Sequence, residues 1–201
     1  MITLLFIIIG AYLIGSIPIG YLLCLLVKGI DIKQYGSGNI GATNVYRIAG
    51  GKLASIVLLM DILKGFFPVL LTQHLSLPFY YSISAGIASI MGHNFSIFLK
   101  GKGGKGVSTG FGVITGLFPL SALFSFLVWI IIVIATRYVS LGAIIAALCL
   151  PFFIYFFQQD TLPLITGAII SFFIIFAHRN NIKRLLTKKE NRILMPWEKR
   201  K

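Results

Sequence analysis

Residues 2–27 form an apolar run without a single charged side chain, and this feature constrains the fold more than any other. A helix needs about 20 apolar residues to cross the hydrocarbon core of a bilayer, so this run is long enough for a membrane span. Similar runs follow along the chain, which is 57% hydrophobic and only 11% charged. That composition leaves too little polar surface for a soluble globule and predicts a polytopic membrane protein.

Positive charge between the apolar runs predicts their orientation, because Lys and Arg are favoured in cytoplasmic loops. Residues 107–136 are ambiguous, since they fit one long span or two short spans with a turn at Pro119. One span would place Arg137 and the C-terminal tail outside. That tail carries nine cations: Arg179, Lys183, Arg184, Lys188, Lys189, Arg192, Lys199, Arg200 and Lys201. Two spans place Arg137 and the tail inside, so the positive-inside rule favours the split.

The sequence therefore predicts an all-α fold, a polytopic membrane helical bundle forming a single domain over residues 1–201. Seven transmembrane helices are expected, with the N-terminus outside and the C-terminus cytoplasmic. Their approximate spans are 2–27 (kinked at Pro18), 53–72, 79–99, 107–118, 119–136, 140–157 and 162–177. Residues 107–118 are short for a bilayer, which leaves open a tilted helix within the bundle or a re-entrant helix.

The net charge of +13 would suggest nucleic acid as the partner of a soluble domain. Here the basic residues lie between and after apolar runs, where they set topology, so no nucleic-acid partner is expected. Cys24 and Cys149 both fall inside apolar runs and are predicted to be small core residues. Their separation fits no metal-ligand spacing, so no metal site is expected.

The glycine-lysine segment, residues 92–110 (GHNFSIFLKGKGGKGVSTG), has the pattern of a phosphate cradle. Gly103, Gly104 and Gly106 leave the backbone N–H groups accessible to an anion, and nearby lysines, Lys105 among them, add positive charge. No strand–turn–helix context supports a dinucleotide site, and no Ser or Thr follows Gly-Lys as in a Walker loop. The simpler alternative is a basic loop that contacts lipid head groups.

The first polar segment, residues 36–47 (GSGNIGATNVYR), ends in an arginine suited to bidentate recognition of phosphate. Small glycines at 38 and 41 allow the loop to wrap an oxyanion closely. The side chains expected to donate hydrogen bonds to phosphate or glycerol oxygens are Ser37, Asn39, Thr43 and Asn44. The alternative is a Gly/Ser/Asn turn followed by a helix cap.

The C-terminal segment, residues 178–190, is the third polar stretch. His178 and Asn181 are nearly one helical turn apart and can point the same way. Glu190 lies among cations and is expected to form a structural ion pair. Asp61 and Lys64, three residues apart inside an apolar run, are expected to form another pair that braces the bundle.

Together the three segments resemble the bacterial glycerol-3-phosphate acyltransferase family that uses acyl phosphate as donor. The sequence Asp61-x-x-Lys64-Gly65 and the stretch from Arg137 to Ser140 also fit. The similarity extends over nearly the whole chain. At one position, Lys188, the family pattern has Gly.

The resemblance implies transfer of a fatty acyl group from acyl phosphate to the 1-hydroxyl of sn-glycerol 3-phosphate. The products would be 1-acyl-sn-glycerol 3-phosphate (lysophosphatidic acid) and phosphate, in the first step of phospholipid synthesis. The enzyme would be a multi-pass protein of the bacterial cytoplasmic (inner) membrane, with its active site on the cytoplasmic face. The expected partners are acyl phosphate, glycerol 3-phosphate and membrane lipid, with no cofactor, no metal and no obligatory protein partner.

The resemblance also assigns roles to residues. Catalytic roles are expected for Ser37, Arg47, Lys105 and His178. Substrate binding is expected for Gly38, Asn39, Gly41, Thr43, Asn44, His93, Gly103, Gly104, Gly106 and Asn181. Structural ion pairs are expected for Asp61, Lys64 and Glu190.

The identity of the general base stays open at this stage. His178 and His93 are candidates by residue type, although a His at the end of a span is more often a packing residue. Alternatively, the departing phosphate accepts the hydroxyl proton, which would make the reaction substrate-assisted. Neither histidine begins the His-x4-Asp signature of glycerol-phosphate acyltransferases that use acyl thioesters, and this absence argues against acyl-CoA as the donor.

Two other classes of function compete with the enzyme. A transporter of organic phosphates would explain cationic loops in a helical bundle, but it predicts charged or broken helices near the midplane. A lipid-binding scaffold would explain the basic tail but not the order of Gly, Ser and Asn in the first polar segment.

Overall fold

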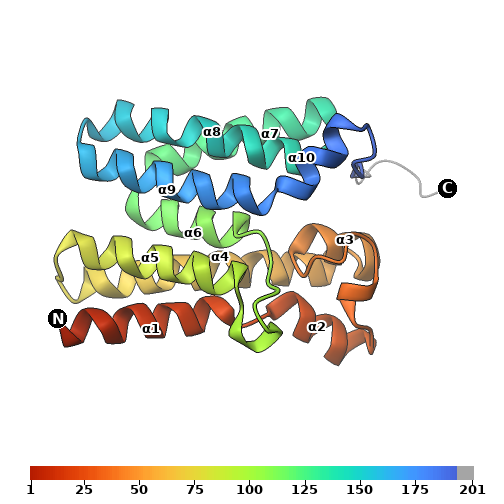
Figure 1. Ribbon diagram of the computed structural model, residues 1–201, viewed down its shortest axis with the longest axis horizontal. Helices are drawn as coiled ribbons and strands as arrows, with labels where there is room; N and C mark the ends of the chain where they lie inside the picture. Colours follow the sequence, from red (N-terminus) through yellow and green to blue (C-terminus); the bar gives the residue numbers. More distant parts are fainter. Residues whose placement is uncertain (194–201) are drawn as a thin grey trace. The chain divides into compact units, whose positions relative to one another are not determined.

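The computed structural model describes residues 1–193, and every regular element among them is helical (Figure 1). Three cations of the predicted tail, Lys199, Arg200 and Lys201, lie outside these residues. Two 3-10 turns are present, η1 (Ile32–Gln34) and η2 (Ile97–Leu99). The α-helices are α1 (Ile2–Ser16), α2 (Ile19–Lys28), α3 (Ala42–Ala49), α4 (Gly51–His74), α5 (Phe79–Asn94), α6 (Val107–Leu117), α7 (Pro119–Thr136), α8 (Val139–Gln158), α9 (Thr161–Ala177) and α10 (Arg179–Leu186).

The chain divides into two compact units, Met1–Pro119 and the residues from Leu120 onward. The first unit contains α1 to α6, with the first polar segment and the glycine-lysine segment. The second contains α7 to α10 and the C-terminal segment.

Five segments of the described chain are long and apolar enough to cross a membrane, as a multi-pass protein requires. They are Ile2–Lys28, Gly51–His74, Phe79–Leu99, Pro119–Thr136 and Val139–Gln158. A sixth is formed if α9 and α10, bent by 59°, are taken together. α6 has 11 residues, about 16 Å of helix, and is too short to cross a bilayer alone. The predicted division at Pro119 is confirmed, because α6 ends at Leu117 and α7 begins at Pro119.

The predicted kink at Pro18 is a complete break between α1 and α2. Proline has no N–H to continue the helix and disfavours a helical Ile17, whose ψ is 116°. Carbonyl groups released at such a break need other donors in a low-dielectric environment. Ser96 Oγ donates to the Ser16 carbonyl at 2.5 Å, and Lys64 Nζ donates to the Ile17 carbonyl at 3.0 Å.

Glycines allow the helices of the first unit to pack backbone against backbone. A Cβ on Gly15 of α1 would lie 2.1 Å from the Ser89 carbonyl oxygen of α5. A Cβ on Gly92 of α5 would lie 2.2 Å from the Tyr12 carbonyl oxygen of α1. The α4–α6 contact repeats this arrangement at Gly65. Within lipid the hydrophobic effect does not bring helices together. Small residues instead allow the close backbone contact on which van der Waals packing depends.

A proline inside α4 creates an unpaired carbonyl that a neighbouring helix satisfies. Pro68 cannot donate to the carbonyl of Lys64, four residues earlier. Ser89 of α5 replaces the missing donor, since its Oγ lies 2.5 Å from the Lys64 carbonyl oxygen. This hydrogen bond joins α4 and α5 inside the first unit.

The second unit uses the same arrangement. Pro151 inside α8 leaves the Ala147 carbonyl without its helical partner. Ser171 of α9 donates to that carbonyl at 2.6 Å, and its side chain is buried. A serine hydroxyl therefore stabilises one proline-containing helix in each unit.

Replacing Ser171 with Ala should lower the free energy of unfolding by about 1 kcal/mol, because the Ala147 carbonyl then loses its donor inside the bundle. The loss should nearly vanish when Pro151 is also replaced by Ala, since residue 151 then supplies an N–H. Thermal unfolding of the two single variants and the double variant in detergent measures this coupling. Additive losses would contradict the assignment. Thr166→Val is a matched control, because the Leu162 carbonyl that accepts from Thr166 keeps its backbone donor.

Candidate functional site

Asn44 organises the first polar segment from a buried position in the first turn of α3. Its Oδ1 accepts a hydrogen bond from the Ser37 N–H at 2.9 Å. Its Nδ2 donates to the carbonyls of Tyr35 at 3.0 Å and Asn39 at 2.9 Å. Both ends of this amide therefore hold the loop that precedes α3, while its expected contact with substrate stays a prediction.

Two glycines of the same loop are required by backbone geometry. Gly36 and Gly38 have φ of +59° and +69°, which L side chains rarely adopt. A Cβ on Gly36 would also lie 2.3 Å from Asn44 Oδ1. Asn39 Oδ1 then accepts from the Gly41 N–H at 2.8 Å and closes the turn into α3.

The remaining polar residues of this segment are partly exposed. Ser37 and Asn39 are half-buried in the loop, and Thr43 and Arg47 are half-buried on α3. Thr43 and Arg47 are four residues apart, so they share one face of that helix. No side chain caps the α3 N-terminus at Gly41. The segment thus contains two hydroxyl groups, an uncapped helix start and a guanidinium within one short stretch.

The glycine-lysine segment folds back onto the end of α5. Gly104 N–H donates to the His93 carbonyl at 2.9 Å, and Gly103 N–H donates to the Asn94 carbonyl at 3.1 Å. A Cβ on Gly103 would lie 2.0 Å from the His93 carbonyl oxygen, so only glycine permits this approach. The loop is therefore held against α5 by its own backbone.

This return leads into the N-terminus of α6 with a lysine immediately before it. Gly106, with φ of +74°, is the N-cap residue, and no side chain caps the helix. The first turn of α6 contains no acidic residue that would offset the helix dipole. Lys105 is half-buried, whereas Lys100 and Lys102 are exposed. A helix start whose N–H groups lack a side-chain cap and lie beside a cation is an anion-binding arrangement.

One hydrophobic cluster joins the two segments inside the first unit. Buried Ile40 of the first polar segment packs with Val57 of α4 and Cys24 of α2. Leu99, at the start of the lysine-rich turn, packs against the same cluster. A Cβ on Gly20 of α2 would lie 1.9 Å from the Ile40 carbonyl oxygen. The structure therefore brings the first polar segment and the glycine-lysine segment to a common support.

An apolar groove with a volume of about 230 Å³ lies beside the break between α1 and α2. Its lining residues are Ile17, Pro18, Tyr21, Leu22, Phe98 and Leu99. Leu99 is followed directly by Lys100 of the glycine-lysine segment. The glycine-lysine segment therefore contributes Phe98 and Leu99 to the wall of the groove, directly before its lysines.

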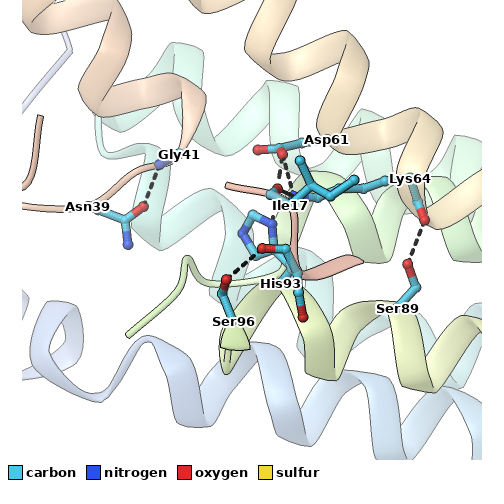
Figure 2. A network of polar contacts seen from close by, with 9 residues as sticks. Ile17, Asn39, Gly41, Asp61, Lys64, Ser89, His93 and Ser96 are labelled. Carbon is cyan, nitrogen blue, oxygen red and sulfur yellow. Dashed lines mark hydrogen bonds and ion pairs between the residues drawn. The ribbon is translucent and has the colours of Figure 1, made fainter. Parts of the chain in front are cut away.

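A buried group of charged side chains lies beneath these segments (Figure 2). Lys64 Nζ is 2.8 Å from Asp61 Oδ1, and the side chains are 6% and 3% exposed. His93 Nδ1 lies 3.8 Å from the same carboxylate oxygen. His93 itself is 4% exposed, so the residue expected to contact substrate lies below the loop surface.

In the second unit, His178 stands at the bend between α9 and α10. Its Nδ1 lies 2.7 Å from the Ile174 carbonyl oxygen. A carbonyl can only accept, so Nδ1 carries the proton and Nε2 has the lone pair in the neutral imidazole. This tautomer is the one in which Nε2 can accept a proton.

Glu190 connects three parts of the second unit. It accepts hydrogen bonds from Ser140 at 2.8 Å, Asn181 at 2.7 Å and Arg184 at 2.7 Å. Burial raises the pKa of the Glu190 carboxyl, but the hydrogen bonds from Arg184, Asn181 and Ser140 outweigh it and hold that pKa below its usual value. The carboxylate therefore links α8, α10 and the segment after α10. Asn181 uses its Nδ2 donor for this hydrogen bond.

Lys188 occupies a position whose geometry favours glycine. Its φ is +56°, and its N–H donates to the Leu185 carbonyl at 3.1 Å. Lys189 N–H donates to the Arg184 carbonyl at 2.8 Å. These two bonds form a Schellman cap, whose left-handed residue is most often Gly. The cap geometry therefore suits the Gly that the family resemblance leads us to expect at this position.

The sequence profile named glycerol-3-phosphate acyltransferase matches residues 5–188 of the chain. The chain belongs to the glycerol-3-phosphate acyltransferase family. The enzyme of that name from Geotalea daltonii is 46% identical over 184 residues, covering 92% of this chain and 94% of its own. The one from Aquifex aeolicus is 43% identical over 189 residues, covering 94% and 98%.

Solved structures agree with this assignment of the chain to the family. A crystal structure of PlsY (YgiH), an integral membrane glycerol 3-phosphate acyltransferase, in the glycerol 3-phosphate form has 41% identity and a TM-score of 0.90. The lysophosphatidic acid form of PlsY has 42% identity and a TM-score of 0.88. Each alignment covers 96% of both chains. The family resemblance inferred from the three polar segments is confirmed.

Sequence reasoning missed the serines that hold the acyltransferase together. Ser89 and Ser96 were given no role, although each donates to a carbonyl released near a proline. A signal was available, because a proline beyond the first turn of a helix leaves the carbonyl four residues earlier without its helical donor. The sequence could not say which hydroxyl would reach it.

Replacing Lys188 with Gly should raise the free energy of unfolding by about 0.5–1 kcal/mol, because glycine adopts the left-handed conformation without the steric cost borne by lysine. Thermal unfolding in detergent measures the change. Lys189→Gly is the control, since it removes the same charge at a position outside the left-handed region. Equal effects of the two substitutions would contradict the explanation.

Acid should destabilise the second unit through Glu190. The folded-state pKa of Glu190 lies below its unfolded value, so the stabilisation is full above about pH 4.5 and is lost as the pH falls through the folded pKa. Glu190→Gln should therefore unfold at a lower temperature than the wild type near neutral pH. The difference should shrink on acidification, as measured by melting curves across the pH range. A constant difference would mean that ionised Glu190 does not provide the stabilisation.

Proposed function

We propose that this protein transfers a fatty acyl group from acyl phosphate to the 1-hydroxyl of sn-glycerol 3-phosphate, yielding 1-acyl-sn-glycerol 3-phosphate and phosphate. The observation that carries the proposal is the uncapped N-terminus of α6, preceded by half-buried Lys105 and reached through a glycine-lined return. That arrangement suits a phosphate group. The names of the relatives supply the acceptor, and PlsY has glycerol 3-phosphate and lysophosphatidic acid forms.

Both substrates in this reaction are anionic, and the residues of the first unit match that requirement. We assign Lys105 and the N–H groups around Gly104 and Gly106 to the phosphate group of glycerol 3-phosphate. Arg47 binds phosphate oxygens in a bidentate manner, while Ser37 and Thr43 donate hydrogen bonds to phosphate or glycerol oxygens. Neutralising the two phosphates allows the acceptor hydroxyl to approach the acyl carbon.

The chemistry needs no covalent enzyme intermediate, because acyl phosphate is a mixed anhydride with phosphate as a good leaving group. The acceptor oxygen forms a bond to the acyl carbon, and the bond from that carbon to the phosphate oxygen breaks. The hydroxyl proton passes to the departing phosphate, which makes the transfer substrate-assisted. His178 is the alternative base in the second unit, since its Nε2 has the lone pair in the neutral form.

Two further assignments complete the substrate sites. The acyl chain needs only apolar contacts, and the groove beside the break between α1 and α2 offers them next to Lys100. Asn181 is assigned to substrate through its Oδ1, which is buried without a hydrogen-bond partner among the described residues. Asn44 and Asn39 act by shaping the loop that presents Ser37.

The topology that goes with this function has seven spans, an external N-terminus and a cytoplasmic C-terminus. Counting α6 and α9 as membrane-embedded helices gives that number, although α6 is short. We propose that residues 1–201 act as one acyltransferase domain in the bacterial inner membrane, with the reaction on the cytoplasmic face. No metal, cofactor or obligatory protein partner is required in this proposal, because cationic side chains and helix N–H groups neutralise the charge.

Purified protein given palmitoyl phosphate and glycerol 3-phosphate should release phosphate and form lysophosphatidic acid, with or without a chelator of divalent cations. Palmitoyl-CoA should be inert. Lys105→Met should lower kcat/KM roughly a hundredfold or more, because one preorganised cation is lost from the phosphate site. Lys52→Met, at an exposed lysine near the start of α4, is the matched control and should leave the rate unchanged.

Phosphate release that does not depend on glycerol 3-phosphate would contradict acyl transfer to this acceptor. If the folded protein forms no product with any combination of donor and acceptor, the proposed enzymatic activity is wrong. Uptake of labelled glycerol 3-phosphate into proteoliposomes would then support the transporter.

A further inference from the structure

His93 lies in a closed position between a buried ion pair and the glycine-lysine segment. Its imidazole is 4% exposed at the end of α5. Nδ1 faces Asp61 Oδ1 at 3.8 Å (Figure 2). On the other side, a Cβ on Gly104 would lie 2.0 Å from His93 Nε2. The ring therefore fills the space beneath Gly104 and is covered by it.

The backbone of the same residue holds the same loop. Gly104 N–H donates to the His93 carbonyl at 2.9 Å, and Gly103 N–H donates to the carbonyl of Asn94 at 3.1 Å. His93 thus contacts Gly104 through both its carbonyl group and its side chain. Gly104 immediately precedes Lys105, so a shift of Gly104 away from the ring would also move the backbone of Lys105.

The ion pair behind His93 is fixed from the other side. Lys64 Nζ donates to the Ile17 carbonyl at the break between α1 and α2, besides pairing with Asp61. The ammonium group therefore has a partner on each side, the Asp61 carboxylate and a carbonyl at the helix break. Removing one member of such a buried pair would leave an uncompensated charge, so the fold needs both members.

We infer that His93 is a positioning residue, which transmits the fixed geometry of the Asp61–Lys64 pair to Gly104 and so places Lys105 and the N-terminus of α6. It acts from beneath the loop and does not touch the reacting atoms. The expected effect on the KM for glycerol 3-phosphate rests on the proposed function. The expected effect on the conformation of the glycine-lysine segment does not.

Three variants test this role. His93→Phe keeps a ring under Gly104 but removes both nitrogens. It should raise the KM for glycerol 3-phosphate roughly ten- to a hundredfold, since a small displacement of a binding loop has effects of that size. The KM for palmitoyl phosphate and the value of kcat should change less than threefold, roughly. His74→Phe, at an exposed histidine at the end of α4, should change none of these.

The second arm measures the loop without using activity. Limited trypsin digestion followed by mass spectrometry reports cleavage after Lys102 and Lys105 relative to cleavage after exposed Lys28 and Lys52. His93→Phe should accelerate the first pair of cleavages severalfold and leave the second pair unchanged. If the wild type forms no lysophosphatidic acid, the proposed function fails, and this arm still decides whether His93 positions the loop.

A third arm tests the contact between the ring and Gly104, and it covers the case in which His93→Phe fails to fold. Gly104→Ala should loosen the loop, because the added methyl group would clash with the imidazole. His93→Asn removes the Nε2 edge of the ring, so the double variant should cleave more slowly than Gly104→Ala alone. Unchanged cleavage and an unchanged KM in His93→Phe, or no recovery in the double variant, would overturn the inference.

Discussion

Backbone carbonyls released by prolines inside the apolar helices are the constraint on which the rest of this structure depends. Lipid offers no hydrogen bonds, so each such carbonyl must find a donor from another helix. Ser89 and Ser171 supply hydroxyl donors for the carbonyls that Pro68 and Pro151 leave unpaired. At the break near Pro18, Lys64 donates to a released carbonyl instead. These bonds fix neighbouring helices relative to one another at defined positions along their axes.

The break at Pro18 also explains why a charged pair is tolerated in the first unit. A lysine ammonium placed between a carboxylate and an accepting carbonyl has partners on both sides, which offsets the cost of removing it from water. Glycines then let α1 pack on α5 and α4 pack on α6 at backbone contact. This packed base carries the first polar segment and the glycine-lysine segment, so the uncapped start of α6 is held in place for the phosphate that we propose it binds.

Much of this fold and part of the site could be predicted from the sequence. Apolar run length predicted the long helices, and Pro18 and Pro119 correctly marked two breaks. The three polar segments predicted the family, which the comparisons confirmed. Seven spans were not established, because α6 is 11 residues long and length alone does not say whether such a helix crosses. The roles assigned to single side chains remain predictions, since residue type does not say which way a side chain points.

The sequence by itself determined the apolar helices, the helix breaks and the three polar segments, because these follow from local composition and from the missing N–H of proline. Only the tertiary structure decided that Asn44 turns inward, that His93 lies beneath Gly104 and that Glu190 has three donors. The contacts of His93 and Glu190 depend on how helices and loops pack, and those of Asn44 depend on how the loop before α3 folds back on that helix. Local sequence carries no record of these side-chain orientations, and so the chemistry of each polar side chain became specific only in the folded bundle.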